Sequence, residues 1–227
     1  MIAEEIQRIT EQLPEGVRLV AVSKYHTIEA ILEAYAAGQR IFGESHAQEL
    51  QRKHTELSDL EAQGLEWHFI GHLQTNKVKY IAPYVHLVHA ADSPRLLEEI
   101  NKQALKASRT IPCLLQLHVA EEDTKFGFSP DEAFAYLDSG IWQQLPGIQL
   151  AGVMAMATNT DNTARIRDDF SRARRFFEQA QAQYFTPATF NELSMGMSDD
   201  WHIAIDEGST LIRIGTQIFG HRDYSQT

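Results

Sequence analysis

The sequence predicts an α/β protein in which eight strands and the helices between them close into one (β/α)8 TIM barrel. Three observations support this fold. Apolar, β-rich segments alternate with amphipathic segments, the strand candidates number eight, and 227 residues approach the roughly 250 typical of this barrel. Strands separated by helices are expected to pair in parallel. A doubly wound open sheet is the alternative, although the pattern shows no point at which the strand order would reverse.

The first half of the chain supplies a leading helix and four strand–helix units. Apolar residues at positions 2, 6, 9 and 13 recur at helical spacing and predict a helix over Ile2–Leu13. Short apolar runs predict strands over Arg18–Ser23, Arg40–Phe42, Trp67–Ile70 and Leu87–Ala90. Amphipathic segments after them predict helices over Thr27–Ala37, His46–Gln63, Asn76–Ile81 and Ser93–Ala107. Gly38 suits the end of the first of these helices, and Ser93 before Pro94 suits the start of the last.

The second half repeats the alternation. Strands are predicted over Pro112–Val119, Gln149–Met156, Phe190–Ser194 and Leu211–Ile214. Helices are predicted over Pro130–Leu137, Thr163–Tyr184 and Asp199–Ala204. Ser129 before Pro130 is a second capping signal. No linker rich in Pro, Gly or Ser interrupts the chain, so we expect a single domain over residues 1–227.

Composition narrows the classes of function. The net charge of −11 opposes binding to nucleic-acid phosphate, so we expect no nucleic-acid partner. Mean hydropathy is −0.32, and no apolar run approaches the roughly 18 residues of a membrane span. The acidic, amphipathic N-terminus does not resemble a signal peptide. The one cysteine, Cys113, lies in an apolar run and is expected to be a core residue. A monomer in the cytoplasm, without membrane contact, is the expectation.

Lys24 ends the apolar run of the first predicted strand, in VRLVAVSKY. The carboxyl ends of barrel strands are where ligands and catalytic groups collect. A desolvated lysine there can lose its proton and attack a carbonyl, forming a Schiff base. The alternative is a solvated lysine at the end of an ordinary strand.

The loops after the last two predicted strands suit a phosphate group. LSMGMSDD at 193–200 offers hydroxyl groups and glycine, and RIGTQIFG at 213–220 places Gly215 and Thr216 at a strand end. Barrels often bind phosphate after their seventh and eighth strands. Arg213 precedes Gly215 by two residues and should face the same side of the sheet. Ordinary tight loops, and a salt bridge made by Arg213 inside the barrel, are the alternatives.

Five histidines occupy or flank predicted strands: His68, His72, His86, His89 and His118. None has the spacing of a helical zinc pair, so we expect no metal site. We interpret them as polar groups that line the mouth of the barrel.

The chain resembles the pyridoxal-phosphate homeostasis protein family. The resemblance rests on AVSK at 21–24, FGES at 42–45 with GlnGlu at 48–49, WHFIGHLQTNK at 67–77, LSMGMSDD at 193–200, and STLIRIGTQIFGHRDYS at 209–225. KFGF at 125–128 and GVMAMA at 152–157 also correspond. The similarity runs nearly end to end, and the last long segment is highly specific.

The resemblance implies a barrel like the N-terminal domain of alanine racemase, with pyridoxal 5′-phosphate (PLP) as cofactor. It implies that Lys24 forms the internal aldimine, a Schiff base with PLP. The phosphate would be held by Ser194, Gly215 and Thr216, with backbone amides around Met195 and Gly196. Arg213 would face the ring nitrogen or the neighbourhood of the phosphate.

The implied function is to bind PLP, buffer its free pool and deliver it to PLP-dependent apo-enzymes, with no catalytic residue assigned. Arginine disfavours the protonated ring nitrogen on which catalytic PLP chemistry depends, and no second domain is expected to bring a second base. A fold-type-III PLP enzyme, such as an amino-acid racemase, is the alternative, with His46 or His68 as its base. A third possibility is a structural or interaction protein.

Two positions depart from the family pattern. Ser45-His46 stands where relatives usually have Asn-Tyr, and Tyr25 stands where many have Thr. No tyrosine role is therefore transferred to position 46.

Overall fold

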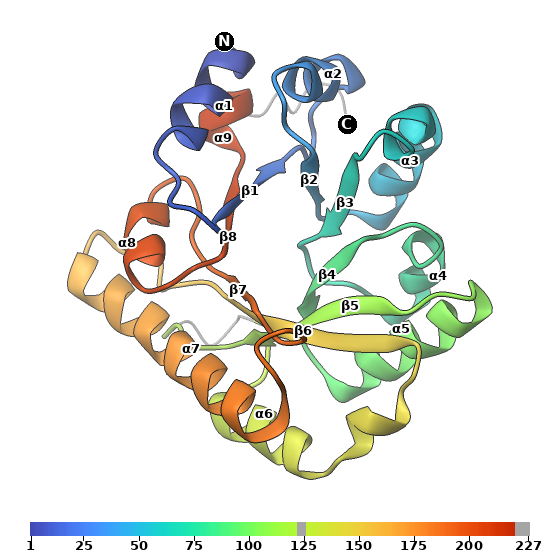
Figure 1. Cartoon of the computed structure of the whole chain (residues 1–227), viewed down its shortest axis with the longest axis vertical. Coiled ribbons are helices and arrows are strands. Elements are labelled where there is room, and N and C mark those ends of the chain that lie inside the picture. Colours follow the sequence, from blue (N-terminus) through green and yellow to red (C-terminus); the bar gives the residue numbers. More distant parts are fainter. Residues whose placement is uncertain (122–125, 221–227) are drawn as a thin grey trace.

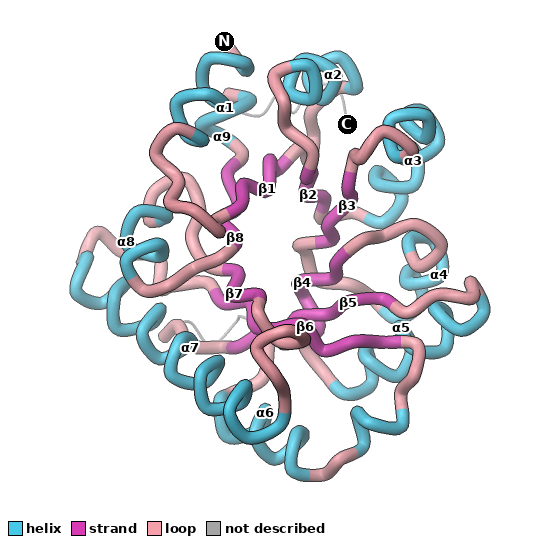
Figure 2. The backbone as a smooth tube through the Cα atoms, in the orientation of Figure 1, coloured by secondary structure: helices cyan, strands magenta, loops and turns pink. Residues whose placement is uncertain are grey.

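The computed structural model describes residues 1–121 and 126–220 and shows a closed barrel of parallel strands (Figure 1). This confirms the predicted fold and excludes the open sheet. The strands follow one another around the barrel in chain order, and Figure 2 shows them as an inner ring surrounded by helices. They are β1 (Arg18–Val22), β2 (Ile41–Glu44), β3 (Glu66–Phe69), β4 (Leu87–Ala91), β5 (Ile111–Leu117), β6 (Ile148–Ala155), β7 (Glu192–Ser194) and β8 (Leu211–Ile214).

The pairing of β1 with β8 closes the barrel. Arg18 lies opposite Leu211 and Ala21 opposite Ile214, so the first and last strands run side by side. The predicted strands agree with those observed to within about two residues at most ends. This closure brings the loop after β1 next to the loop after β8, which is the arrangement that the predicted site requires.

The helices surround the strands, and most begin where their capping signals predict. They are α1 (Ile2–Thr10), α2 (Ile28–Ala36), α3 (Ala47–Glu61), α4 (Val78–Ile81), α5 (Pro94–Lys106), α6 (Pro130–Asp138), α7 (Thr163–Tyr184), α8 (Trp201–Asp206) and α9 (Thr216–Phe219), with 3-10 turns η1 (Thr75–Lys77) and η2 (Ile141–Gln144). The Ser93 hydroxyl accepts from the amide of Leu96, and Ser129 forms a capping box with Glu132. Neither η2 nor α9 was predicted, because four residues are too few to show a helical period.

Strand side chains alternate between the barrel interior and the layer of helices. Val20 and Ile41 belong to a small cluster formed by residues of the strands alone, inside the barrel. Their neighbours Ala21 and Phe42 belong to the larger cluster between strands and helices. Cys113 is fully buried in that larger cluster, as predicted, and burial raises the pKa of its thiol.

Two parts of the sequence patterns used above lie outside the described residues. These are Lys125, the first residue of KFGF, and residues 221–225 of the C-terminal segment. Over the described ranges, no helix is both long enough and apolar enough to cross a membrane.

Candidate functional site

A cavity of about 680 Å³ opens at the carboxyl ends of the strands. Its walls come from strand ends and the loops that follow them, which is where barrels carry their sites. The lining residues are Val22, Lys24, His26, Ile70, Met156, Met197, Ser198, Asp199, Trp201, His202, Arg213, Gly215, Thr216 and Gln217. The volume lies within the range of about 300–1,000 Å³ common to small-molecule sites.

The structure brings four of the seven predicted site residues to this cavity. Lys24 follows β1, while Arg213, Gly215 and Thr216 come from β8 and the start of α9. The side chain of Arg213 and the position of Gly215 reach the same cavity, as the alternation of a strand predicts. Segments almost 190 residues apart in sequence therefore meet, because β1 and β8 are paired.

The other three predicted residues lie behind the cavity wall rather than on it. Ser194 and Met195 are fully buried. The amide of Met195 donates to the carbonyl of Leu211 and to the hydroxyl of Ser209, so its hydrogen is used within the fold. The carbonyl of Gly196 accepts from the amide of Arg213 (3.0 Å). In this loop it is Met197, Ser198 and Asp199 that face the cavity.

Gly196 allows the loop after β7 to turn tightly over α8. Its φ is +92°, in the left-handed region, and an added Cβ would lie 2.7 Å from the Cβ of Ala204 and 2.9 Å from the Cα of Trp201. Only glycine fits this position without displacing α8. The loop is thereby held where its next three residues reach the cavity.

A buried chain of hydrogen bonds leads from Arg213 into the barrel. The guanidinium donates to the hydroxyl of Ser194 (2.5 Å) and to the carbonyl of Ala155 (3.1 Å). The Ser194 hydroxyl lies 2.9 Å from Nδ1 of His89, and Nε2 of His89 lies 2.9 Å from Nδ1 of His68. We call Arg213, Ser194, His89 and His68 the histidine chain.

The Ser194 oxygen accepts from Arg213, because a guanidinium can only donate. A serine oxygen can accept twice and donate once, so the bonds between Ser194 and His89 and between His89 and His68 can run in either direction. Burial lowers the pKa of both imidazoles, that of His89 well below its ordinary value, so both are neutral.

Arg213 is a buried cation whose side-chain hydrogen bonds, over the described residues, go to uncharged groups. It is 4% exposed, and burial lowers its pKa to about 10. Within the described ranges, its side-chain hydrogen bonds go to a hydroxyl and a carbonyl, while the charge of Asp200 acts on its pKa in the opposite direction to burial. The internal salt bridge considered above is therefore not what this part of the chain shows. A buried arginine on a cavity wall suits an anionic ligand.

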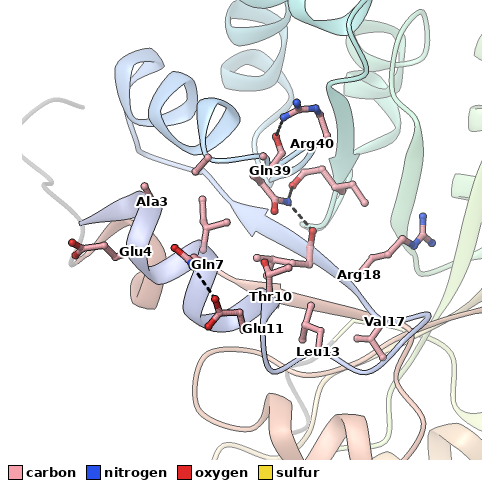
Figure 3. A pocket seen from close by; sticks show the side chains of 15 residues that line it. Ala3, Glu4, Gln7, Thr10, Glu11, Leu13, Val17, Arg18, Gln39 and Arg40 are labelled. Carbon is pink, nitrogen blue, oxygen red and sulfur yellow. Dashed lines mark hydrogen bonds between the residues drawn. The ribbon is translucent and has the colours of Figure 1, made fainter.

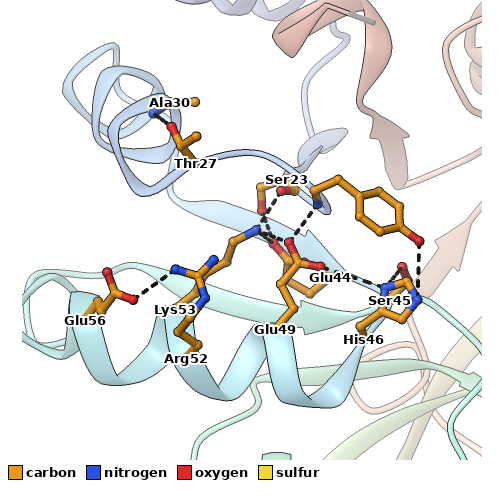
Figure 4. Close-up of polar contacts among 11 residues, drawn as sticks. Ser23, Thr27, Ala30, Glu44, Ser45, His46, Glu49, Arg52, Lys53 and Glu56 are labelled. Atoms are coloured by element: carbon orange, nitrogen blue, oxygen red, sulfur yellow. Dashed lines mark hydrogen bonds and ion pairs between the residues drawn. The ribbon is translucent and has the colours of Figure 1, made fainter. Parts of the chain in front are cut away.

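A second buried cluster supports the turn that carries Lys24 (Figure 4). We call it the lysine clamp: Lys53, Glu49, Glu44 and the peptide groups of Ser23 and Tyr25. Lys53 on α3 is fully buried, and its ammonium donates to the Ser23 carbonyl (2.8 Å) and to Oε1 of Glu44 and Glu49 (2.7 Å each). Burial raises the pKa of Glu44 to about 7. The other oxygen of Glu44, Oε2, is buried with no hydrogen-bond partner within the described ranges, which suits protonation.

The two positions expected to depart from the family pattern lie in contact with each other. The Tyr25 hydroxyl is 3.4 Å from Nε2 of His46, and the two rings are 5.2 Å apart. The Ser45 hydroxyl is 3.2 Å from Nδ1 of the same histidine. The residues at positions 25, 45 and 46 therefore form one group beside the lysine-bearing turn.

The prediction that the histidines line the barrel mouth was wrong for His68 and His86. Both line a cavity of about 280 Å³ that also includes Arg18, Glu66 and Pro112, at the amino ends of the strands. His89 lies fully buried between the two ends. Alternation predicts which side of a strand a residue faces, but not its depth along the barrel axis.

The histidines that do line the large cavity, His26 and His202, were not predicted. His26 stacks on Phe219 and His202 on Trp201. The signal for His26 was its place two residues after Lys24. Neither His46 nor His68, the two bases considered for an enzyme, is among the residues lining this cavity.

A separate cavity, also of about 680 Å³, lies between α1 and the amino ends of β1 and β2 (Figure 3). Gln39 on its wall donates to the carbonyls of Leu19 and Ile41, and Gln7 donates to Glu11. None of the seven predicted site residues lines it. Within residues 1–121 and 126–220, no cluster of three or more His, Cys, Asp or Glu could hold a metal ion.

The chain is similar to known proteins over nearly its whole length. The family model described as alanine racemase, N-terminal domain, matches residues 1–223. A protein of Aquifex aeolicus named pyridoxal phosphate homeostasis protein is 38% identical, with 98% of this chain and 96% of that protein covered. One of the same name from Pasteurella multocida is 39% identical, with 99% and 96% covered.

Solved structures agree with this result. PipY of Synechococcus elongatus is 40% identical, with 97% of this chain and 100% of that chain covered; its structure without PLP gives a TM-score of 0.90 and its structure with PLP bound gives 0.87. Alanine racemase from E. faecalis is 20% identical and shares the fold alone, with a TM-score of 0.70 over 97% of this chain and 57% of the racemase. The barrel, the aligned length and these identities show that the chain belongs to the pyridoxal phosphate homeostasis protein family, built on the fold of the alanine racemase N-terminal domain.

Proposed function

We propose that this protein binds PLP in the cavity at the carboxyl ends of the strands and holds it as a Schiff base on Lys24. One observation carries the proposal: a lysine that follows β1 and a buried arginine, hydrogen-bonded to uncharged groups over the described residues, line the same cavity. PLP combines an aldehyde with an anionic phosphate, so it needs an amine and positive charge together. The PLP bound to PipY, at 40% identity over the full barrel, supports the same assignment.

The lining of the cavity fits the parts of the cofactor. Val22 and Ile70 offer apolar surface to an aromatic ring. Ser198 and Thr216 offer hydroxyl groups, and Gly215, whose missing side chain leaves room for Val22 of β1, brings its backbone to the cavity wall. We expect Thr216, Gly215 and the loop after β7 to hold the phosphate. Ser194, Met195 and Gly196 then shape that loop from behind, and direct phosphate contact by them stays a prediction.

Lys24 supplies the covalent step. Its amine would add to the aldehyde carbon of bound PLP, and the C–O bond would give way to C=N with the release of one water molecule. The reverse step, hydrolysis, releases the cofactor unchanged. Bound PLP supplies an electrophilic carbon, and a reversible imine requires no other reactant than water.

The role that best fits this chemistry is to hold PLP and release it, the homeostasis for which the relatives are named. A buried Arg213 opposes protonation of any ring nitrogen beside it, which weakens the electron sink that catalysis on PLP requires. We therefore propose storage and delivery to PLP-dependent apo-enzymes in the cytoplasm. Those partners, the monomeric state and the location stay predictions.

The test is a titration of the purified protein with PLP. The visible absorption band of a protonated Schiff base is the signal that is measured. Wild type should develop the band in proportion to a single site. Lys24→Ala should not, while Lys102→Ala, at an exposed lysine on α5, should behave like wild type. A band of full size in Lys24→Ala would overturn the assignment.

A further inference from the structure

We propose that Lys53 and Glu49 are positioning residues that fix Lys24 in the cavity by holding the peptide groups on both sides of it. The inference rests on the proposed function, because it assigns a task to residues that do not touch PLP. It concerns the lysine clamp of Figure 4.

The clamp holds the turn at two points. On one side of Lys24, the carbonyl of Ser23 accepts from the Lys53 ammonium (2.8 Å). On the other side, the amide of Tyr25 donates to Oε1 of Glu49 (2.7 Å). The same Oε1 accepts from Lys53 (2.7 Å), so the two points are joined to each other. The backbone of Lys24 is thus fixed relative to α3, a helix that contributes no side chain to the lining of the cavity.

The turn needs such a hold because its backbone is strained. Tyr25 has φ of +66°, a left-handed conformation that a bulky residue rarely adopts. Such conformations persist only where the surrounding structure over-determines them, and they concentrate at functional sites. Here the bond from the Tyr25 amide to Glu49 is available only while the peptide keeps this orientation. The turn is also held on the Ser23 side, where the Ser23 carbonyl accepts from the His26 amide (3.0 Å) and the Ser23 hydroxyl donates to Glu44 (2.6 Å). Loss of the Glu49 contact would therefore free the Tyr25 side of the turn and weaken the hold on Lys24.

Stability alone does not explain the buried charge. Lysine is almost never fully buried unless it is paired, and Lys53 is paired with carboxylates from β2 and from its own helix. Desolvation of such a cluster offsets most of its attraction, and apolar replacements are often as stable. What an apolar side chain could not do is bind a carbonyl and orient a carboxylate toward an amide. Both of those contacts are made to the two residues that flank Lys24.

The deciding experiment compares Lys53→Met with wild type, because methionine keeps the shape of the stem and removes the charge. Arg52→Met, on the exposed face of the same helix where Arg52 pairs with Glu56, is the matched control. Two quantities are measured. The first is the equilibrium constant for Schiff-base formation with PLP. The second, measured without PLP, is the rate at which an amine-reactive reagent labels Lys24, which is located by peptide mass spectrometry. We expect Lys53→Met to weaken Schiff-base formation roughly 10- to 100-fold and to change the labelling rate of Lys24, with Arg52→Met unchanged.

Glu49→Ala and Glu49→Gln keep the test decisive if Lys53→Met does not fold, as judged by circular dichroism. Glu49→Ala removes the acceptor of the Tyr25 amide and should lose binding similarly, whereas Glu49→Gln keeps an oxygen there and should recover part of it. A folded Lys53→Met or Glu49→Ala with wild-type labelling and binding would overturn the inference. Wild type that forms no Schiff base on Lys24 would instead refute the proposed function.

Discussion

At the scale of single residues, the site depends on charges that the fold has removed from water. Lys53 and Arg213 are both buried cations, but their surroundings differ. Lys53 has two carboxylates within 2.7 Å, while Arg213 donates to a hydroxyl and a carbonyl and faces a cavity. The first is satisfied within the protein, whereas the second lines the cavity, which is why we propose Arg213 as the residue that attracts the anion.

Glu44 gives the lysine clamp a measurable pH dependence. Its pKa of about 7 in the folded protein exceeds the ordinary value of 4.5, chiefly because of burial. The folded protein therefore binds this proton more tightly than the unfolded chain, and the contribution of Glu44 to the free energy of unfolding falls as pH rises from about 4.5 to about 7. Glu44→Gln lacks this titration. The free energy of unfolding of Glu44→Gln minus that of wild type should therefore rise across this window.

Urea denaturation at several pH values measures this difference. Glu56→Gln, at an exposed position of α3, is the control variant, and its free energy of unfolding is compared with that of wild type at the same pH values. A difference for Glu44→Gln that stays constant across the window would show that Glu44 remains ionised beside Lys53.

At the scale of elements, the loops after β7 and β8 were harder to predict than the strands that precede them. Apolar runs predict the strands. The alternation of side chains along a strand predicts that Arg213 and Gly215 face the same side of the sheet. The depth of Ser194 does not: it faces the interior as a strand residue should, but it lies beneath Arg213, bonded to His89. The Met195 amide could not be assigned either, because its acceptors, the Leu211 carbonyl and the Ser209 hydroxyl, depend on how this strand end meets β8.

Gly196 tests how the loop after β7 is held. Gly196→Ala would place a Cβ 2.7 Å from that of Ala204 at a φ of +92°, while Gly16→Ala would meet nothing within 4 Å at a φ of +87°. The second variant incurs backbone strain alone, about 1–2 kcal/mol, and the first adds a steric clash. We expect Gly196→Ala to be the less stable of the two in thermal unfolding and to bind PLP more weakly, with binding by Gly16→Ala unchanged. An equal loss of thermal stability in the two variants would show that α8 moves to accommodate the added Cβ without further destabilisation.

At the scale of the whole molecule, the barrel connects its two ends through its interior. The histidine chain runs from Arg213 at the large cavity to His68, whose Nε2 lies 3.7 Å from Glu66 at the amino ends of the strands. Four strands contribute one member each, so the histidine chain forms only when the barrel is closed. From the sequence, the number and order of strands could be predicted because each is a local pattern. The histidine chain could not, because it joins residues up to 145 positions apart, from His68 to Arg213.

Ser194→Ala should break the histidine chain at its centre. It removes the hydroxyl that accepts from the buried guanidinium and contacts Nδ1 of His89, and each unsatisfied buried group costs about 1–3 kcal/mol. We expect the free energy of unfolding in urea to fall by at least that amount. Thr55→Ala, which removes an exposed hydroxyl on α3, should change it by no more than about 0.5 kcal/mol. Similar values for the two variants would mean that water replaces the Ser194 hydroxyl.

The central claim is that Lys24 carries the cofactor, and reduction by borohydride tests it most directly. Borohydride converts a Schiff base into a stable amine, so the modified lysine can be located by peptide mass spectrometry after digestion. We predict one phosphopyridoxyl group per chain, on Lys24. Modification spread over exposed lysines such as Lys102, or no modification at all, would contradict the assignment of this cavity to PLP.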